Sequence, residues 1–452
     1  MLVEFSVENF SSIKDKITFS LEATTDNSLP QNCISVDIPK STKEKQSIKL
    51  LNSAAIFGPN ASGKTNFLRA MGILRTIIYS SNNYQLGQRF PIYPFLLDQN
   101  CVEKPSIFSV LFIKNSIKYL YELSITSTKV VSESLFYYPN GKKVQVFKRG
   151  IDNNISFMPI NEKKSDEDEI RRKIYLEEIS ENILVLSLAN KIKIKPLQEA
   201  FSWFYELTAI KNDIYPNETS KRIHENTVSK ERVLKYLKLA DSSIEDLELD
   251  VKEIEENNLP DYIKKMVIEE LAKEKNMSPA ELESDFNKKA RIVKTEIKEN
   301  FIHIGKDKSG NSVRIALPKF LESDGTQKLY GIISSIILSI VNGSVLFVDE
   351  LDLRLHTNLV RTIVQIYSSE LNKKGAQLIF TAHDTNLLDT QMLLRRDQIW
   401  FTEKQSDCRT ELYCLSEFKI RKDKVIRKSY LAGIFGAIPN VTLEDILWQE
   451  NL

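Results

Sequence analysis

The segment GPNASGKT, residues 58–65, has the composition and spacing of a loop that binds nucleotide phosphates. Gly58 and Gly63 allow backbone angles that a side chain would forbid, so successive N–H groups can turn toward a phosphate. Lys64 brings a positive charge to the outer phosphates, and Thr65 offers a hydroxyl to Mg²⁺ at the start of a helix whose dipole favours anions. The spacing therefore predicts a loop for a nucleotide triphosphate and its magnesium ion.

Carboxylates and a histidine follow two later apolar runs. Asp349 and Glu350 come directly after VLFV, where Asp349 could hold the magnesium shell and Glu350 could polarise an attacking water. His383 follows LIFTA, where its imidazole could bond to a terminal phosphate. A surface turn is the alternative for the acidic pair, and a lone histidine is more often an ordinary surface or core residue. The succession of the two runs favours the catalytic interpretation.

A second phosphate-binding position is predicted within ESDGTQKL. Ser323, Gly325 and Thr326 precede an isoleucine-rich helix, whose free N–H groups and positive dipole end favour a phosphate. If the loop at Gly58 already holds the triphosphate, this helix start needs a nucleotide of its own. The alternative is an ordinary helix cap, because Ser and Asp are common N-cap residues.

The elements around these residues predict an α/β fold. SAAIF reads as a strand before the phosphate loop, and apolar residues recur at helical spacing after it, from Phe67 to Ile78. Toward the C-terminus, VLFVDE and AQLIFTAH read as buried strands, separated by an amphipathic helix at LVRTIVQIYSSELNKK. This alternation predicts a mostly parallel sheet covered by helices.

Composition divides the chain into three parts. Residues 1–166 are rich in alternating strand patterns, which predicts a strand-rich N-terminal lobe. Residues 167–301 contain no glycine and many Glu, Lys, Ile and Leu residues, which predicts a helical insertion with a possible strand at EDLELDV. Within it, 260–276 and 278–300 are expected to be helices, since each has a proline near its start. Residues 302–452 return to the α/β pattern.

Charge and cysteine content narrow the class of protein. The 62 basic and 61 acidic residues balance, so contact with nucleic acid would require a local basic patch. The four cysteines lack C-x-x-C spacing, which disfavours a zinc site or a disulfide framework and favours a reducing cytoplasm. We find neither a signal-peptide pattern nor an apolar run long enough to cross a bilayer, and we expect a cytoplasmic protein without membrane contact.

Taken together, these motifs resemble the ABC-type head of the SMC, RecF and OLD-like ATPases, in which a helical segment interrupts the nucleotide domain. More narrowly, the chain is similar to the AAA family ATPases of bacterial phage-defence islands, such as those of the Septu, PARIS and retron-associated systems. The stretches that carry the likeness are FSVENFSSIKD, GPNASGKTNFLRAM, ESDGTQKL, VDELDLRLHTNL, TAHDTNLLD and YLAGIFGAIPN. The resemblance implies an ABC-type P-loop ATPase head that uses ATP and Mg²⁺.

The resemblance also implies roles for single residues. It assigns nucleotide binding on the loop to Gly58, Asn60, Ser62, Gly63, Lys64, Thr65 and Asn66. Thr65 and Asp349 would hold magnesium, and Glu350 would direct the attacking water. Lys64 and His383, the switch histidine, would complete the catalytic set.

Other implied roles concern a partner chain. Ser323, Gly325 and Thr326 would reach across a homodimer, or a higher homo-oligomer, to the ATP of the opposing subunit. Asp352 and His356 would be the polar members of the D-loop. The chain has Ser11 where the family usually carries an arginine, and Gln99 is a weak candidate for the glutamine loop.

The leading hypothesis is an ATPase that dimerises around ATP and regulates a separate effector, a nuclease or toxin, in anti-phage defence. About 70 residues follow His383, too few for an appended Toprim nuclease, which is why we expect the effector on another chain. The alternatives are a scaffold gated by a nucleotide that it does not hydrolyse and a RecF-like DNA-repair ATPase. A transporter cassette would have no place for the long insertion.

Overall fold

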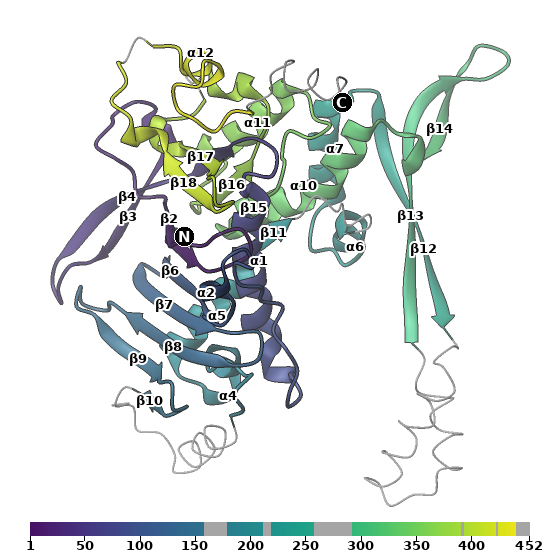
Figure 1. Cartoon of the computed structure of the whole chain (residues 1–452). Coiled ribbons are helices and arrows are strands. Elements are labelled where there is room, and N and C mark those ends of the chain that lie inside the picture. Colours follow the sequence, from purple (N-terminus) through teal and green to yellow (C-terminus); the bar gives the residue numbers. More distant parts are fainter. Residues whose placement is uncertain (158–178, 211–217, 257–291, 390–392, 422–423, 440–452) are drawn as a thin grey trace, which may run out of the picture. The chain divides into compact units, whose positions relative to one another are not determined.

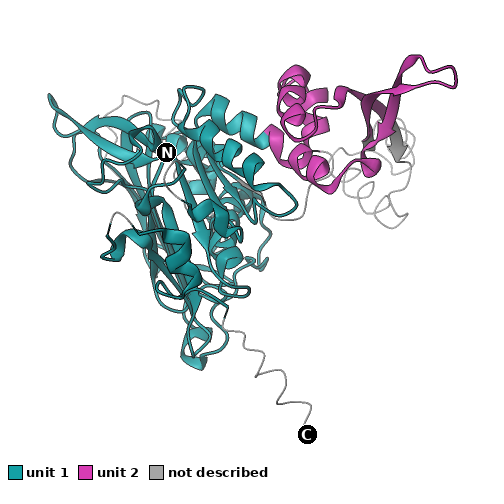
Figure 2. Cartoon of the chain, turned by 90° about the horizontal axis from the view of Figure 1, so that it is seen from above, with its two compact units in different colours: residues 1–214, 335–452 teal, residues 215–334 magenta. Residues whose placement is uncertain are grey.

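The computed structural model describes residues 1–157, 179–210, 218–256, 292–389, 393–421 and 424–439 (Figure 1). The chain forms two compact units, which Figure 2 distinguishes by colour. Residues 1–214 and 335–452 form the larger unit, and residues 215–334 form the smaller one. None of the helices in the described ranges is long and apolar enough to cross a membrane.

The N-terminal part of the larger unit is an antiparallel sheet of seven strands in the order β10-β9-β8-β7-β6-β1-β2. Its strands are β1 (Leu2–Glu8), β2 (Ile17–Ser20), β6 (Ser106–Lys114), β7 (Ile117–Ile125), β8 (Val130–Tyr137), β9 (Val144–Arg149) and β10 (Ile155–Phe157). A separate hairpin joins β3 (Cys33–Pro39) to β4 (Lys45–Leu51). Alternating residues of β6 and β7 are buried, as expected for strands with one apolar face. The predicted strand-rich lobe is confirmed.

A second sheet of six strands has the order β11-β15-β16-β5-β17-β18, and only its edge strand β18 runs antiparallel to its neighbour. Its strands are β5 (Ser53–Phe57), β11 (Thr208–Ile210), β15 (Val345–Val348), β16 (Gln377–Thr381), β17 (Ile399–Lys404) and β18 (Thr410–Cys414). Every residue of β5, β15 and β16 is buried, which is typical of parallel strands covered on both faces. The predicted α/β class with a mostly parallel core is confirmed.

Short and long helices connect these strands. The α-helices of the larger unit are α1 (Lys64–Ser80), α2 (Gln99–Val102), α4 (Ala189–Ile192), α5 (Lys195–Glu206), α11 (Thr357–Ser368) and α12 (Ile426–Leu431). Its 3₁₀ turns are η1 (Pro30–Asn32), η2 (Ser81–Asn83), η3 (Leu186–Leu188), η5 (Thr385–Leu388), η7 (Arg396–Gln398) and η8 (Leu415–Glu417), whereas η4 (Lys319–Leu321) belongs to the smaller unit.

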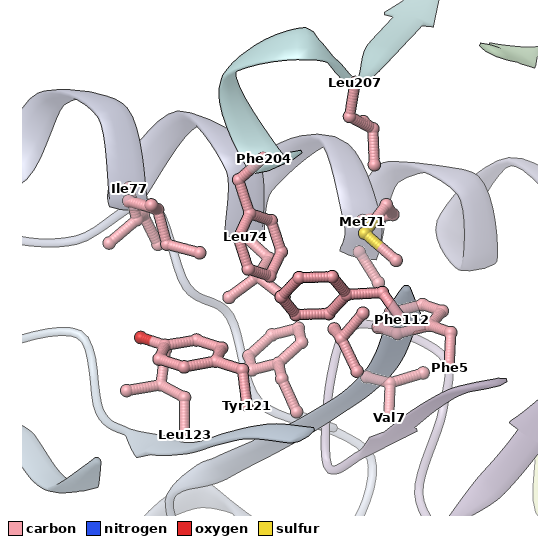
Figure 3. Close-up of a cluster of buried hydrophobic side chains, with 14 of the residues drawn as sticks. Phe5, Val7, Met71, Leu74, Ile77, Phe112, Tyr121, Leu123, Phe204 and Leu207 are labelled. Carbon is pink, nitrogen blue, oxygen red and sulfur yellow. The ribbon is translucent and has the colours of Figure 1, made fainter. Parts of the chain in front are cut away.

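Helix α1 packs within the main hydrophobic core. Its apolar residues recur every three or four positions, so one side of the helix is apolar, and Met71 and Leu74 are fully buried. Figure 3 shows them beside Phe5 of β1, Phe112 of β6 and Phe204 of α5. The same core includes residues of both sheets, so the helix that begins at the phosphate loop is held from several sides.

Strand β5 obtains both of its neighbours from the C-terminal part of the chain. It pairs with β16 through Leu378↔Ser53 and with β17 through Ile399↔Ala55. The side chain of Gln377, at the start of β16, accepts a bond from the Leu2 amide at 2.6 Å and donates to the Leu2 carbonyl at 3.0 Å. Strands from the N-terminal and C-terminal parts of the chain therefore form one sheet, and Gln377 also bonds to β1.

The smaller unit combines helices with a long antiparallel sheet in the order β12-β13-β14. Its elements are α6 (Glu218–His224), α7 (Lys230–Ala240), β12 (Ile244–Glu256), β13 (Ile292–Lys306), β14 (Ser312–Pro318) and the first part of α10 (Asp324–Asn342). The strand predicted at EDLELDV lies within β12 and is confirmed.

The helix predicted over 278–300 is wrong for residues 292–300, which belong to β13. Pairing with β12 overrides the helical composition, because Ile297 and Phe301 are buried opposite Val251 and Leu247. The rest of that prediction, and the whole of 260–276, lie outside the described residues. The division at 166 and 301 stays a prediction.

Candidate functional site

The loop at residues 58–63 connects the C-terminal end of β5 to the start of α1, as the phosphate-loop motif requires. Gly63 is the N-cap of α1 with φ 108°, in the region that favours glycine. A β-carbon on Gly63 would overlap the side chain of Thr410, and one on Gly58 would overlap Thr402. Both glycines are thus required by the close approach of the β17–β18 hairpin.

Lys64 is 6% exposed, at the first position of α1. Its ammonium group donates to the carbonyls of Gly58 at 2.6 Å and Pro59 at 2.9 Å. Burial lowers the pKa of Lys64, and the charges of Asp349 and other nearby carboxylates oppose that shift. The lysine is therefore held against its own loop and near the predicted acidic pair.

Hydroxyl groups fix the loop to the hairpin. Ser62 Oγ lies 2.6 Å from Thr402 Oγ1, and Thr410 Oγ1 donates to the Ser62 carbonyl at 2.9 Å. Ser12 Oγ lies 2.8 Å from Thr410 Oγ1 and accepts a bond from Asn66 Nδ2 at 2.9 Å. The sequence interpretation assigned Ser62 and Asn66 to the nucleotide but missed Ser12, whose contacts come from distant parts of the chain.

Parallel pairing brings the acidic pair to the edge of the sheet where the phosphate loop lies. Strands β15, β16 and β5 are neighbours, and their carboxyl ends meet at one edge. Asp349 is 5% exposed, and its Oδ1 accepts a bond from Thr381 Oγ1 at 2.7 Å. The Glu350 amide donates to the same hydroxyl at 2.6 Å. One buried threonine at the end of β16 thus binds both members of the pair.

Glu350 and His383 face one another across this edge. Glu350 Oε1 lies 3.7 Å from His383 Nε2, and both side chains are partly exposed. Glu350 has φ 46°, a left-handed conformation that is unfavourable for a residue other than glycine. Such a backbone conformation persists only where neighbouring bonds enforce it, and the bonds around Thr381 do so here.

Asp352 connects the acidic turn to the histidine turn. Its Oδ2 accepts bonds from the amides of His383 at 2.6 Å and Asp384 at 2.5 Å. Its Oδ1 is buried and has no hydrogen-bond partner within the described ranges. His356 caps α11, since its Nδ1 accepts a bond from the Asn358 amide at 3.2 Å. Asp352 thus bonds to the histidine turn, whereas the imidazole of His356 bonds to the start of its own helix.

The predicted magnesium ligands are suited to that ion. Thr65 is exposed in the first turn of α1, and Asp349 keeps its second carboxylate oxygen without a hydrogen-bond partner in the described part of the chain. Hydroxyl and carboxylate oxygens are the hard ligands that Mg²⁺ prefers, usually together with substrate phosphates. The unpartnered oxygen of Asp352 adds further negative charge nearby, consistent with its effect on Lys64.

The predicted signature residues lie in the smaller unit, at the start of α10. Ser323 is exposed, and its hydroxyl accepts a bond from the Thr326 amide at 3.1 Å and lies 2.9 Å from Thr326 Oγ1. Gly325 is partly exposed, whereas Thr326 is 2% exposed. Within the chain, Ser323 therefore acts as a helix cap.

Three other predicted residues have different surroundings. Asn60 is exposed on the phosphate loop. Gln99 is exposed at the start of the short helix α2, which Asp98 caps. Ser11 has φ 52°, and its amide donates to the Tyr93 carbonyl at 2.8 Å.

A family model described as "AAA domain, putative AbiEii toxin, Type IV TA system" matches residues 53–389. That range runs from β5 to the turn that follows His383. No curated protein matches the chain.

Solved structures of SMC heads also match at low identity. An SMC head bound to the C-winged helix domain of ScpA is 13% identical over 91% of this chain and 97% of its own, with a TM-score of 0.40. The SMC head domain from Thermotoga maritima is 12% identical over 91% and 98%, with a TM-score of 0.35. A Pyrococcus furiosus head with an extended coiled coil, bound to the C-terminal domain of ScpA, is 13% identical over 91% and 96%, with a TM-score of 0.35.

Proposed function

The chain belongs to the family of AAA domains described as putative AbiEii toxin, Type IV TA system, and on this premise we propose that it binds and hydrolyses ATP. The observation that carries the proposal is the arrangement at one sheet edge. Lys64 begins the helix after β5, Asp349 and Glu350 follow β15, and His383 follows β16. A cation, two carboxylates and an imidazole at neighbouring strand ends are the groups that phosphoryl transfer to water requires.

Each residue has a task in this proposal. The amides of the phosphate loop surround the triphosphate, and Lys64 exchanges its bonds to the Gly58 and Pro59 carbonyls for bonds to phosphate oxygens. Glu350 orients a water for in-line attack, and His383 donates a bond to the terminal phosphate. Magnesium, held by Thr65 and Asp349, would neutralise charge on the phosphates.

Thr381 sets the geometry of this reaction without touching the substrate. Its hydroxyl has one proton, which it donates to Asp349, and it accepts the bond from the Glu350 amide. The magnesium ligand and the water-directing carboxylate therefore keep a fixed spacing before ATP arrives. Prearranged groups of this kind lower the cost of reaching the transition state.

We further propose that ATP joins two heads into a homodimer. Ser323 is exposed and Gly325 partly exposed at this helix start, where a hydroxyl and the first backbone amides could receive the terminal phosphate of a partner chain. The contact would exist only while the γ-phosphate is present, so hydrolysis would separate the heads.

The regulated process is proposed to be defence against phage through a separate effector, a nuclease or toxin. The description of the family mentions a toxin of a type IV toxin–antitoxin system, which supports a role in growth control or defence. Purification of the chain with its genetic neighbours would test for the effector, which should associate with the ATP-bound form and dissociate after hydrolysis.

The ATPase proposal is tested by Glu350→Gln, which keeps the shape of the side chain and removes its charge. The variant should bind ATP and accumulate dimers, but release phosphate at least about 100-fold more slowly than the unmodified protein. Glu370→Gln, at an exposed position after α11, is the matched control and should release phosphate normally. Normal turnover in Glu350→Gln would refute the role of Glu350. Tight ATP binding with no phosphate release from the unmodified protein would favour the scaffold.

A further inference from the structure

A cavity of about 360 Å³ lies in the C-terminal part of the larger unit and includes none of the nucleotide-site residues. Its wall is formed by side chains of β17 and β18, by residues at the end of η8, and by a turn that follows α12. The lining residues are Glu403, Tyr413, Glu417, Phe418, Ile434, Phe435 and Gly436. The turn belongs to YLAGIFGAIPN, a segment that the nucleotide site does not use.

Two carboxylates line the cavity without a counter-charge. The Tyr413 hydroxyl donates its one proton to the Phe435 carbonyl at 2.7 Å and lies 3.2 Å from Glu403 Oε2, while Glu417 Oε1 accepts a bond from the Cys414 amide at 2.8 Å. Neither carboxylate forms an ion pair with any residue that the structure describes, and no lysine or arginine lines the cavity. Glu417 is thus oriented by a backbone bond, and each carboxylate keeps an oxygen for a cation.

Aromatic rings form much of the remaining wall. The rings of Tyr413 and Phe418 lie 5.8 Å apart, and those of Phe418 and Phe435 lie 5.3 Å apart at a steep angle. Aromatic faces attract cations, and a planar guanidinium can stack on a ring while its N–H groups bond to carboxylates. The wall therefore suits a guanidinium better than a compact ammonium.

The shape of the cavity depends on a glycine. Gly436 has φ 66°, and a β-carbon there would lie 2.8 Å from Glu403 Oε2 and 2.9 Å from the Tyr413 hydroxyl. The absence of a side chain lets the turn approach the two polar groups closely. A methyl group at this position would push into the space beside the carboxylate.

Exposed apolar residues surround this segment. Val425, Leu431 and Ile434 are 44%, 56% and 55% exposed, and Ile434 also lines the cavity. An anchoring charged group in a pocket with apolar contacts around it is the usual composition of a protein interface. A free small cation would gain nothing from these apolar residues.

We propose that the cavity between β17, β18 and the 434–436 turn binds an arginine side chain of a partner polypeptide. The interaction is separate from the nucleotide site. It would give the ATPase a contact through which another protein is recognised.

The test measures binding of N-acetylarginine amide by ligand-observed NMR, with N-acetylcitrulline amide as the uncharged analogue of the same shape. Agmatine, which carries the guanidinium without peptide groups, tests whether the natural ligand is a small guanidinium compound. The variants are Glu403→Gln, Glu417→Gln and Gly436→Ala, and the control is Glu411→Gln, whose carboxylate pairs with Arg409 on the same hairpin. Thermal melting of each variant checks that the fold is retained.

We expect saturable binding of N-acetylarginine amide that weakens at least tenfold in Glu403→Gln and in Glu417→Gln and is unchanged in Glu411→Gln. Citrulline binding as strong as that of arginine, or full binding in the double variant Glu403→Gln/Glu417→Gln, would overturn the proposal. If agmatine bound more tightly than N-acetylarginine amide, the ligand would be a small molecule and not an arginine of a partner polypeptide. ATP hydrolysis should be the same in all four single-residue variants, so this test can fail independently of the ATPase proposal.

Discussion

The phosphate-loop edge and the start of α10 are both predicted to bind phosphate, but they are built differently. At the edge, Lys64, Asp349 and Thr381 are buried and joined to residues of neighbouring strands. At the start of α10, Ser323 is exposed, and among the described residues its hydroxyl bonds with Thr326, three residues later in the chain. The phosphate-loop residues are held by tertiary contacts, whereas the bonds that the structure describes for the Ser323 hydroxyl are local to the start of α10.

This difference indicates which region can act in a single chain. The edge contains a cation together with the proposed magnesium ligand and the proposed water-directing carboxylate, so we expect it to bind a triphosphate without groups from another chain. A capped helix start offers only a few amides and a hydroxyl, and by itself it is indistinguishable from an ordinary cap. The proposed dimer supplies what the helix start lacks, namely a phosphate already held by another chain.

The largest expected effect comes from removing the cation of the edge. Lys64→Ala should weaken ATP binding by about 100-fold, because charge-assisted bonds contribute up to about 3 kcal/mol each. Calorimetric titration with ATP measures the change, and Lys373→Ala, at an exposed position, should bind like the unmodified protein. Equal affinity in Lys64→Ala would place the triphosphate elsewhere.

The next effect tests whether the edge depends on its tertiary bonds. Thr381→Val keeps the side-chain volume but leaves Asp349 without its donor, so kcat should fall roughly 10- to 100-fold with little change in ATP affinity. Thr381→Ser restores the hydroxyl and should recover most of the rate. Steady-state kinetics over a range of Mg²⁺ concentrations would show this split. Equal rates in the valine and serine variants would mean that Thr381 only packs.

The helix start is tested by separating its cap from its proposed phosphate contact. Ser323→Asp keeps an N-cap acceptor, so the melting temperature should change little, while its negative charge should repel a phosphate and reduce ATP-dependent dimerisation about tenfold. Ser323→Ala should instead cost about 1 kcal/mol of stability. Light scattering with ATP measures the dimer. A fully dimeric Ser323→Asp would leave Ser323 with the capping role alone.

The smallest expected effect concerns the hydrogen bonds that link the phosphate loop to the β17–β18 hairpin through Ser12. Ser12→Ala removes the hydroxyl that links Asn66 to Thr410 and should weaken ATP binding by about threefold, near the value of one neutral hydrogen bond. Ser11→Ala should have no effect, since no side-chain bond is recorded for it in the described ranges. Weaker ATP binding in Ser11→Ala than in Ser12→Ala would instead assign the contact to Ser11, the position where the family usually has an arginine.

Sequence could predict the residues whose function depends on local spacing. The phosphate loop and the acidic strand end are each contained in a few consecutive residues, so their elements were predicted correctly. Thr381 could not be found in this way, because its contacts depend on the register of two strands. Val348 pairs with Phe380, and this register places the next residue of each strand, Asp349 and Thr381, side by side.

The prediction for β13 shows the opposite limitation. The charged, glycine-free sequence of residues 292–300 is compatible with a helix, and pairing with β12 selects the extended form. The cavity at Glu403 is likewise assembled from three separate segments, which no local pattern connects.

The position of β5 between β16 and β17 has a consequence for how the protein is made. The ribosome synthesises the phosphate loop well before β16 and β17, the two strands that flank β5. The nascent N-terminal part therefore carries an apolar strand with both edges unpaired through most of translation, a condition that favours chaperone binding or misassembly. A polypeptide truncated before β16 would lack Thr381 and His383, and with them part of the proposed nucleotide site.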